Sequence, residues 1–182
     1  PVSRWYPDGQ KKALTQYALN KRRDSVFNGK QINWHPNGQL KSTQLYDLGV
    51  IVTDTGWHQD GKKHYFAPYR GGKWHGVRKI WHPNGQLSFQ CQFEDGLKNG
   101  PCKSWHQDGK PQSTTSYRKD RKDGAQAAWY ENGKQRYKRQ YKAGQAVGAI
   151  TYWHENGQLA QKGNMDGGPF EAFDAAGKPL AG

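Results

Sequence analysis

Polar and apolar residues alternate along short stretches of this chain, and glycine-containing turns separate the stretches. Gln86 to Phe93 reads QLSFQCQF, in which every second residue is apolar. A period of two is typical of a β-strand with one buried face. Little in the rest of the sequence favours a helix. The pattern therefore predicts short strands joined by tight turns.

The same pattern recurs along the whole chain. A large aromatic ring appears in eight copies, and the step is 24 residues from Trp57 to Trp153. Glycine stands four residues after each ring, and Asp or Asn precedes it in the first seven copies. A second large apolar side chain follows the ring by 12 residues in those copies. We predict a single repeat domain over residues 1–182, anchored at Trp5, Trp34, Trp57, Trp81, Trp105, Trp129, Trp153 and Phe173.

Each copy predicts a hairpin of two strands. Asn-Gly and Asp-Gly are strong hairpin signals, because a tight turn needs residues at positive φ. We expect left-handed backbone at both residues of these pairs, which would explain why Asp and Asn exchange there. The predicted fold is all-β, an elongated antiparallel meander of about eight stacked β-hairpin repeats. Terminal copies depart from the spacing, as capping repeats often do.

The repeated motif W-[HY]-x-[DN]-G-[QK], the later ring and the trailing glycines resemble the MORN family, and more closely the variant found in bacterial YwqK-type antitoxin proteins. Phe93, Gly96 and Gly100 follow the usual Tyr-x-Gly-x-x-x-x-Gly core closely, whereas Val52 and Asp120 break it. Immunity proteins with such repeats occur beside secreted antibacterial effectors, including phospholipases. The resemblance therefore implies a toxic protein partner in a Gram-negative envelope. Classical MORN repeats imply anionic lipid instead.

The histidines that follow the repeat tryptophans are candidates for chemistry. They allow two readings, a metal or acid–base site and a turn residue that packs on the next repeat. Tyr6 and Tyr130 occupy the same position, and successive copies should lie about 9–10 Å apart, too far to share a zinc ion. Packing is therefore the favoured reading. The histidines concerned are His35, His58, His82, His106 and His154.

No other motif supplies catalytic machinery. Asp and Asn exchange at the turn, and an amide cannot replace a general acid. The chain carries neither a G-x-S-x-G elbow nor a phosphate-binding P-loop. We predict a protein that is not an enzyme, with no catalytic, cofactor-binding or metal-binding residues and no cofactor.

Composition changes this picture only in part. The chain is 33% hydrophobic with a mean hydropathy of −1.15, which leans toward disorder, but it carries 8 Trp, 10 Tyr and 6 Phe. These rings bury large areas, so we expect a thin core built from them. The net charge of +13 favours an acidic partner protein, anionic lipid or nucleic acid. No apolar run is long enough to predict a transmembrane segment.

Binding specificity is expected where copies depart from the repeat. Three stretches do so, NKRRDS from Asn20, PYRGGKWH from Pro68 and YRKDRKDG from Tyr117. The alternatives are solvated loops for the basic clusters and local packing for Trp74, the one Trp outside the ring register. We predict a partner-binding set that consists of Arg22, Arg23, Arg70, Lys73, Trp74, Arg118, Lys119, Arg121 and Lys122.

Two cysteines bear on the compartment. Cys91 and Cys102 flank the turn EDGLKNG, so an antiparallel hairpin could place them opposite each other. A disulfide there would favour an oxidising compartment, but we expect two free thiols as the commoner case. The chain begins at Pro1, and a cleaved export signal upstream is one explanation. A periplasmic or cell-envelope location is the expectation, with the cytoplasm as the alternative.

Three functions follow from these observations. The first is an immunity or antitoxin protein that binds and occludes a toxic effector with an acidic surface. The second is a scaffold that binds anionic membrane lipid. The third is nucleic-acid binding, which ranks last because the rings are expected in the core and no nucleic-acid motif is present.

Overall fold

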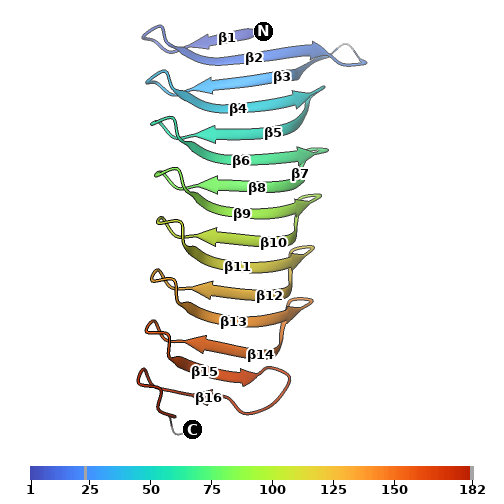
Figure 1. The fold of residues 1–182 in the computed structure, drawn as a ribbon. Helices are drawn as coiled ribbons and strands as arrows, with labels where there is room; N and C mark the ends of the chain where they lie inside the picture. Colours follow the sequence, from blue (N-terminus) through green and yellow to red (C-terminus); the bar gives the residue numbers. More distant parts are fainter. Residues whose placement is uncertain (23, 181–182) are drawn as a thin grey trace. The chain divides into compact units, whose positions relative to one another are not determined.

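The computed structural model describes residues 1–22 and 24–180, which form sixteen β-strands and no helix (Figure 1). The strands pair in an antiparallel manner, and each pairs with its neighbours in chain order. The exception is β6, which pairs with both β7 and β8. The predicted all-β meander of hairpin repeats is confirmed. The described residues contain no helix long and apolar enough to cross a membrane.

The chain divides into two compact units, and each is described by itself. The first comprises Pro1–Leu87 with Phe93–Gly96, and the second comprises Ser88–Gln92 with Leu97–Gly182. The single repeat domain over residues 1–182 stays a prediction.

The first unit is a sheet in the order β1-β2-β3-β4-β5-β6-β8, with the short β7 paired to β6. The strands are β1 (Val2–Trp5), β2 (Lys11–Leu19), β3 (Ser25–Trp34), β4 (Leu40–Asp47), β5 (Val50–Trp57), β6 (Lys63–Arg70), β7 (Lys73–Trp74) and β8 (Gly76–Trp81).

The second unit continues in chain order from β10 to β16. Strand β9 (Leu87–Glu94) contributes residues to both units. The remaining strands are β10 (Leu97–Trp105), β11 (Pro111–Arg118), β12 (Arg121–Trp129), β13 (Gln135–Lys142), β14 (Gln145–Trp153), β15 (Leu159–Asn164) and β16 (Glu171–Ala172).

The turns that follow the repeat tryptophans, here called Trp-side turns, have three-residue loops. In the first, Gly9 N donates to Tyr6 O (3.0 Å), and Tyr6 N donates to Gln10 O (2.8 Å). Gly9 has φ of +83°, whereas Asp8 is not among the residues with positive φ. This is a type I turn closed by a left-handed glycine. Our expectation of left-handed backbone at both residues of the Asp-Gly or Asn-Gly pair is therefore wrong.

The connections at the opposite strand ends are here called return turns, and most of them have two residues. Between β4 and β5, Asp47 pairs with Val50, and the two residues between them have φ of +42° at Leu48 and +90° at Gly49. Two left-handed residues in succession define a type I′ hairpin, whose twist matches that of the flanking strands. The geometry that the sequence suggests for the Trp-side turns is thus found in the return turns.

The two faces of the sheet carry different rings. In β13, Lys138 Nζ lies 5.7 Å from the Trp153 ring centroid, whereas the guanidinium of the adjacent Arg139 lies 5.3 Å from that of Tyr141. Neighbouring strand residues point to opposite faces, so the repeat tryptophans define one face and the later rings the other. We call these the tryptophan face and the tyrosine face.

The expected core of buried aromatic rings is not found, because most of the rings are only half-buried. Trp5 is 58% exposed and Tyr17 is 44% exposed, and most other rings are half-buried, with Phe93 an exception at 4%. No helix or second sheet covers either face among the described residues, so a ring is shielded only by neighbouring strands. Apart from Phe93, the buried apolar residues are alanine, cysteine and isoleucine side chains, namely Ala67, Cys91, Cys102, Ala128 and Ile150.

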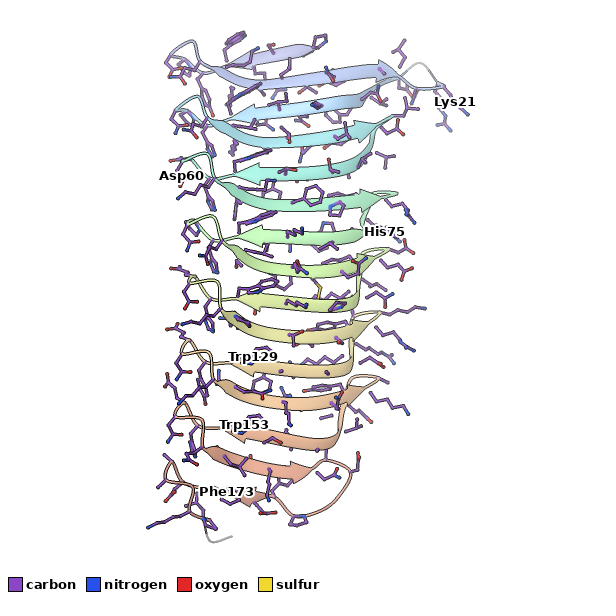
Figure 2. The ribbon with its side chains drawn as sticks, in the orientation of Figure 1. Lys21, Asp60, His75, Trp129, Trp153 and Phe173 are labelled. Atoms are coloured by element: carbon purple, nitrogen blue, oxygen red, sulfur yellow. A yellow bond between two sulfur atoms is a disulfide. The ribbon has the colours of Figure 1, made fainter. Side chains whose placement is uncertain are left out.

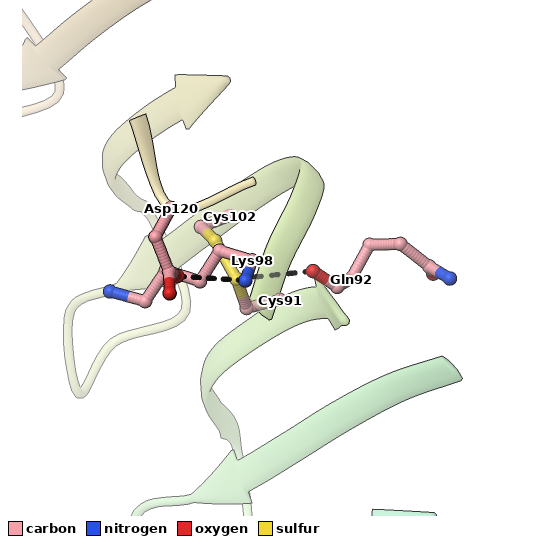
Figure 3. The surroundings of a disulfide bond; sticks show 5 residues. All are labelled: Cys91, Gln92, Lys98, Cys102 and Asp120. Atoms are coloured by element: carbon pink, nitrogen blue, oxygen red, sulfur yellow. Dashed lines mark hydrogen bonds between the residues drawn. A yellow bond between two sulfur atoms is a disulfide. The ribbon is translucent and has the colours of Figure 1, made fainter. Parts of the chain in front are cut away.

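Cys91 of β9 and Cys102 of β10 form a disulfide within the second unit (Figure 3). Both residues are buried on the tyrosine face. The expectation of two free thiols is wrong, because the hairpin brings the two positions opposite each other. Beside the bond, Lys98 N donates to Asp120 Oδ1 (2.8 Å), which ties β10 to the following return turn.

Candidate binding surfaces

The ring that follows each repeat tryptophan reaches forward to the next repeat. In five copies its polar atom contacts the backbone oxygen of the next anchoring ring residue, and histidine does so from Nε2 when that nitrogen carries a proton. Histidine and tyrosine exchange here because either can donate to a carbonyl. The pairs are Tyr6 Oη with Trp34 O (2.9 Å), His35 Nε2 with Trp57 O (3.1 Å), His106 Nε2 with Trp129 O (3.4 Å), Tyr130 Oη with Trp153 O (2.8 Å) and His154 Nε2 with Phe173 O (2.9 Å).

His58 departs from this pattern. Its ring lies 4.4 Å from that of His64, and its buried Nε2 has no hydrogen-bond partner. Burial and the neighbouring His58 lower the pKa of His64. Two histidines alone do not make a metal centre, and the described residues contain no group of three or more potential ligands. The absence of an enzymatic role stays a prediction.

In the first seven Trp-side turns, the Asp or Asn before the glycine accepts a hydrogen bond from the backbone two residues later. Asp108 Oδ1 accepts from Lys110 N (3.0 Å), and Asn132 Oδ1 accepts from Lys134 N (2.9 Å). The side-chain hydrogen bond with Lys110 is the main reason that the pKa of Asp108 is lowered. Asp and Asn therefore exchange because both offer this oxygen, and not because both tolerate left-handed backbone.

Trp74 occupies a regular place in the repeat. It stands seven residues before Trp81, where Lys98 and Lys122 stand before their own tryptophans. Its ring is half-buried and packs edge-on against Phe93 at 5.1 Å, and the Arg78 guanidinium lies 4.9 Å from its centroid. The structure thus shows the local packing that was the alternative to an exposed anchor, and a role in partner binding stays a prediction.

The predicted basic residues lie at the return turns. Arg22 is exposed beside the first turn, and Arg23 lies outside the described residues. Arg70 and Lys73 are exposed and pair with each other across the Gly71–Gly72 turn, so the structure brings these two together.

The strongest cluster is in the second unit. Exposed Arg118, Lys119 and Arg121 surround a surface hollow that Lys142 also lines. Asp123 lines the same hollow, but its Oδ2 accepts from the backbone N of Ala143 (3.1 Å). Lys122 points elsewhere, with its Nζ 4.8 Å from the Tyr141 ring centroid. We call Arg118, Lys119, Arg121 and Lys142 the basic turn cluster. Lys142 was not among the predicted residues, because it belongs to the next return turn.

A polar row on the tyrosine face was also missed. Arg139 Nε donates to Gln126 Oε1 (2.6 Å), and Gln126 Nε2 donates to Thr115 Oγ1 (3.1 Å). Gln126 and Thr115 are buried. In other copies the same repeat positions hold Cys91, Cys102 or Ile150. A polar residue at these positions was the sequence signal that could have revealed the row.

The first unit has a similar network around Asp54. Its Oδ1 accepts from Tyr65 Oη (3.1 Å), and its Oδ2 accepts from Gln44 Nε2 (3.3 Å). Burial and then the Asp54 carboxylate raise the pKa of Tyr65 to about 12, so this hydroxyl stays a donor at neutral pH. In both networks the hydrogen bonds join side chains of neighbouring strands.

The fold defines a protein of stacked β-hairpin repeats. Four segments match the family model of the MORN repeat variant, and they cover residues 27–47, 74–95, 98–119 and 146–166. The chain therefore carries MORN-variant repeats. Each match begins seven residues before an anchoring tryptophan, which places Trp74 at the start of its repeat. No curated protein matches the chain.

The copies anchored at Trp5, Trp57, Trp129 and Phe173 lie outside the matched segments, yet they form the same Trp-side turns. The hydrogen-bond pattern thus extends the repeat beyond what the family model matches. MORN repeats in general are scaffolds that bind proteins or lipids.

Proposed function

We propose that this protein is an immunity protein that binds a toxic effector enzyme and occludes its active site. The observation that supports the proposal is the basic turn cluster. Arg118, Lys119 and Arg121 are exposed, and the one carboxylate at the hollow, that of Asp123, is engaged with the backbone. Such cations remain available to pair with an acidic surface, which raises association rate and specificity.

The resemblance to YwqK-type antitoxins gives this partner its identity as a toxin, with secreted phospholipases as one class. The periplasm or cell envelope is the proposed compartment. The Cys91–Cys102 disulfide supports an oxidising location, since such bonds persist outside the reducing cytosol.

Charge reversal in the basic turn cluster tests the proposal. The full chain is tested against the protein encoded by each adjacent gene, and inhibition of any toxic enzyme among them is measured by titration. Arg118→Glu with Arg121→Glu should weaken inhibition at least tenfold, mainly through slower association at low salt. The matched control is Lys30→Glu with Lys178→Glu, two exposed lysines outside the cluster, which changes the net charge equally. Equal loss in both double variants, or an effector that the wild-type chain never inhibits, would contradict the proposal.

Binding to anionic lipid is the second candidate, and the same exposed cations favour it. Basic residues near an anionic bilayer contribute about 1 kcal/mol each, and the effect is screened by salt. Flotation with vesicles of phosphatidylglycerol and of neutral lipid separates the two candidates. Retention by anionic vesicles alone, lost in the Arg118→Glu and Arg121→Glu variant, would favour the lipid scaffold.

A further inference from the structure

The anchoring rings of consecutive repeats flank narrow slots on the tryptophan face. Each slot lies over the strand that runs between two strands ending in anchoring rings, as β2 runs between β1 and β3. A side chain of this middle strand enters the slot. Between Trp5 and Trp34, Lys11 places its Nζ 5.4 Å from one ring centroid and 5.8 Å from the other. A cation within about 6 Å of an indole face is attracted by the ring quadrupole. This slot therefore holds an ammonium between two indoles.

Three further slots also hold an ammonium of the chain itself. In each, a lysine six or nine residues after the preceding anchoring ring reaches the following ring. The distances are 5.3 Å from Lys63 Nζ to the Trp81 centroid, 5.7 Å from Lys138 Nζ to that of Trp153 and 5.9 Å from Lys162 Nζ to that of Phe173.

Three slots have no lysine at either of these positions. In two of them leucine stands at the first position, as Leu40 and Leu87. In the slot between Trp105 and Trp129 the two positions hold Pro111 and Thr114, and a largely apolar hollow there is lined by both tryptophans. Exposed Lys103 lines the same hollow. Trp129, Trp153 and Phe173 mark successive repeats at one end of the strands in Figure 2. The hollow thus has a tryptophan on each side, as the slot that receives Lys11 does.

We propose that the Trp105–Trp129 slot binds a trimethylammonium group attached to a phosphate, as in the phosphocholine headgroup. A quaternary ammonium has no N–H groups, so apolar walls can receive it without leaving a donor unsatisfied. Its recognition by aromatic side chains is well established in proteins. The headgroup takes the place that Lys11 fills in the first slot.

The charge around the slot explains why the ligand carries a phosphate. The protein has a net charge of +13, and Lys103 stands at the hollow, so both repel a simple cation such as choline. A phosphate beside the ammonium cancels its charge and can pair with the Lys103 ammonium. Phosphocholine therefore satisfies both the indole walls and the lysine.

Titration of the full chain with small ligands tests the site. Tryptophan fluorescence and calorimetry should give a dissociation constant near 1 mM for phosphocholine, as expected for a pair of cation–π contacts. Choline should bind several-fold more weakly, and glycerol phosphate should not bind. If glycerol phosphate binds as well as phosphocholine, the protein attracts anions only and the proposal is overturned.

Matched variants locate the site. Pro111→Lys places a lysine where Lys11 and Lys63 stand, so it should fill the slot and weaken phosphocholine binding at least tenfold. Leu40→Lys adds a lysine at the same repeat position of the Trp34–Trp57 slot, away from Trp105 and Trp129, and should leave binding within twofold. Equal weakening by both variants would show a general charge effect and refute the site. Circular dichroism confirms that each variant is folded.

Lys103→Gln supplies a readout that a structural role would not produce. It should weaken phosphocholine binding and strengthen choline binding, because Lys103 attracts the phosphate and repels the ammonium. If both ligands change in the same direction, the proposed orientation is wrong. Flotation with phosphatidylcholine vesicles then identifies the source of the headgroup. Retention assigns it to a membrane lipid, and binding of only the soluble ligand assigns it to a free phosphocholine compound.

Discussion

Removing one hydroxyl from a Trp-side turn measures how strongly neighbouring repeats are coupled. Tyr130 Oη donates to Trp153 O at 2.8 Å, and Tyr130→Phe deletes this donor while it keeps the ring. A net hydrogen bond contributes about 0.5–1.5 kcal/mol, so we expect a loss of about 1 kcal/mol in the free energy of unfolding. With a urea dependence of about 1–3 kcal/mol/M, the midpoint should fall by roughly 0.3–1 M.

Two comparisons make this result specific. Tyr141→Phe is the control, because the Tyr141 hydroxyl makes no hydrogen bond to any described residue, and its midpoint should barely move. Tyr130→His should recover part of the loss, since His154 makes the same contact from Nε2 at 2.9 Å. If Tyr130→Phe and Tyr141→Phe lower the midpoint equally, the hydroxyl does not couple the repeats and the reasoning fails.

Three further predictions use the same urea assay. Asp108→Asn should leave the midpoint at pH 7 nearly unchanged and Asp108→Ala should lower it, because only the amide keeps an acceptor for the Lys110 backbone; equal loss would contradict the turn assignment. Reduction of the Cys91–Cys102 disulfide, which joins residues 11 apart, should lower the stability of the second unit by about 2–4 kcal/mol, with the unreduced protein in the same buffer as control. Burial lowers the pKa of His64 from 6.5, so the unfolded chain binds this proton first as the pH falls, and the free energy of unfolding should decrease below about pH 6.5. His64→Gln should reduce the difference in urea midpoint between pH 7.5 and pH 5.5. An unchanged difference would show that other groups cause it.

The sequence predicts the strands and their order well, because both depend on local patterns. Alternation in Gln86 to Phe93 and the recurring ring at steps of 24 residues suffice for an antiparallel meander. Turn geometry is less accessible, since Asn-Gly pairs fit both a two-residue type I′ turn and a three-residue loop. The choice depends on strand register, which places the type I′ turn at Leu48–Gly49.

The candidate sites are predicted only in part, because they depend on neighbours one repeat away. The basic stretch from Arg118 is visible as sequence, whereas its association with Lys142 requires the next return turn. Trp74 is out of register when copies are aligned on the anchoring rings alone, yet it stands at a regular position seven residues before Trp81. The Trp105–Trp129 slot is recognisable only once Lys11 is seen between its own pair of rings.

The forward contacts of the Trp-side turns end on main-chain oxygens. Tyr6, His35 and Tyr130 each bind a carbonyl, which every amino acid supplies. A repeat therefore makes no demand on the side-chain identity of its neighbour through this contact. Gene duplication or deletion in whole-repeat steps can then change the length of the array without compensating mutations. The exposed side chains of each copy are left to diverge under selection by whatever they bind.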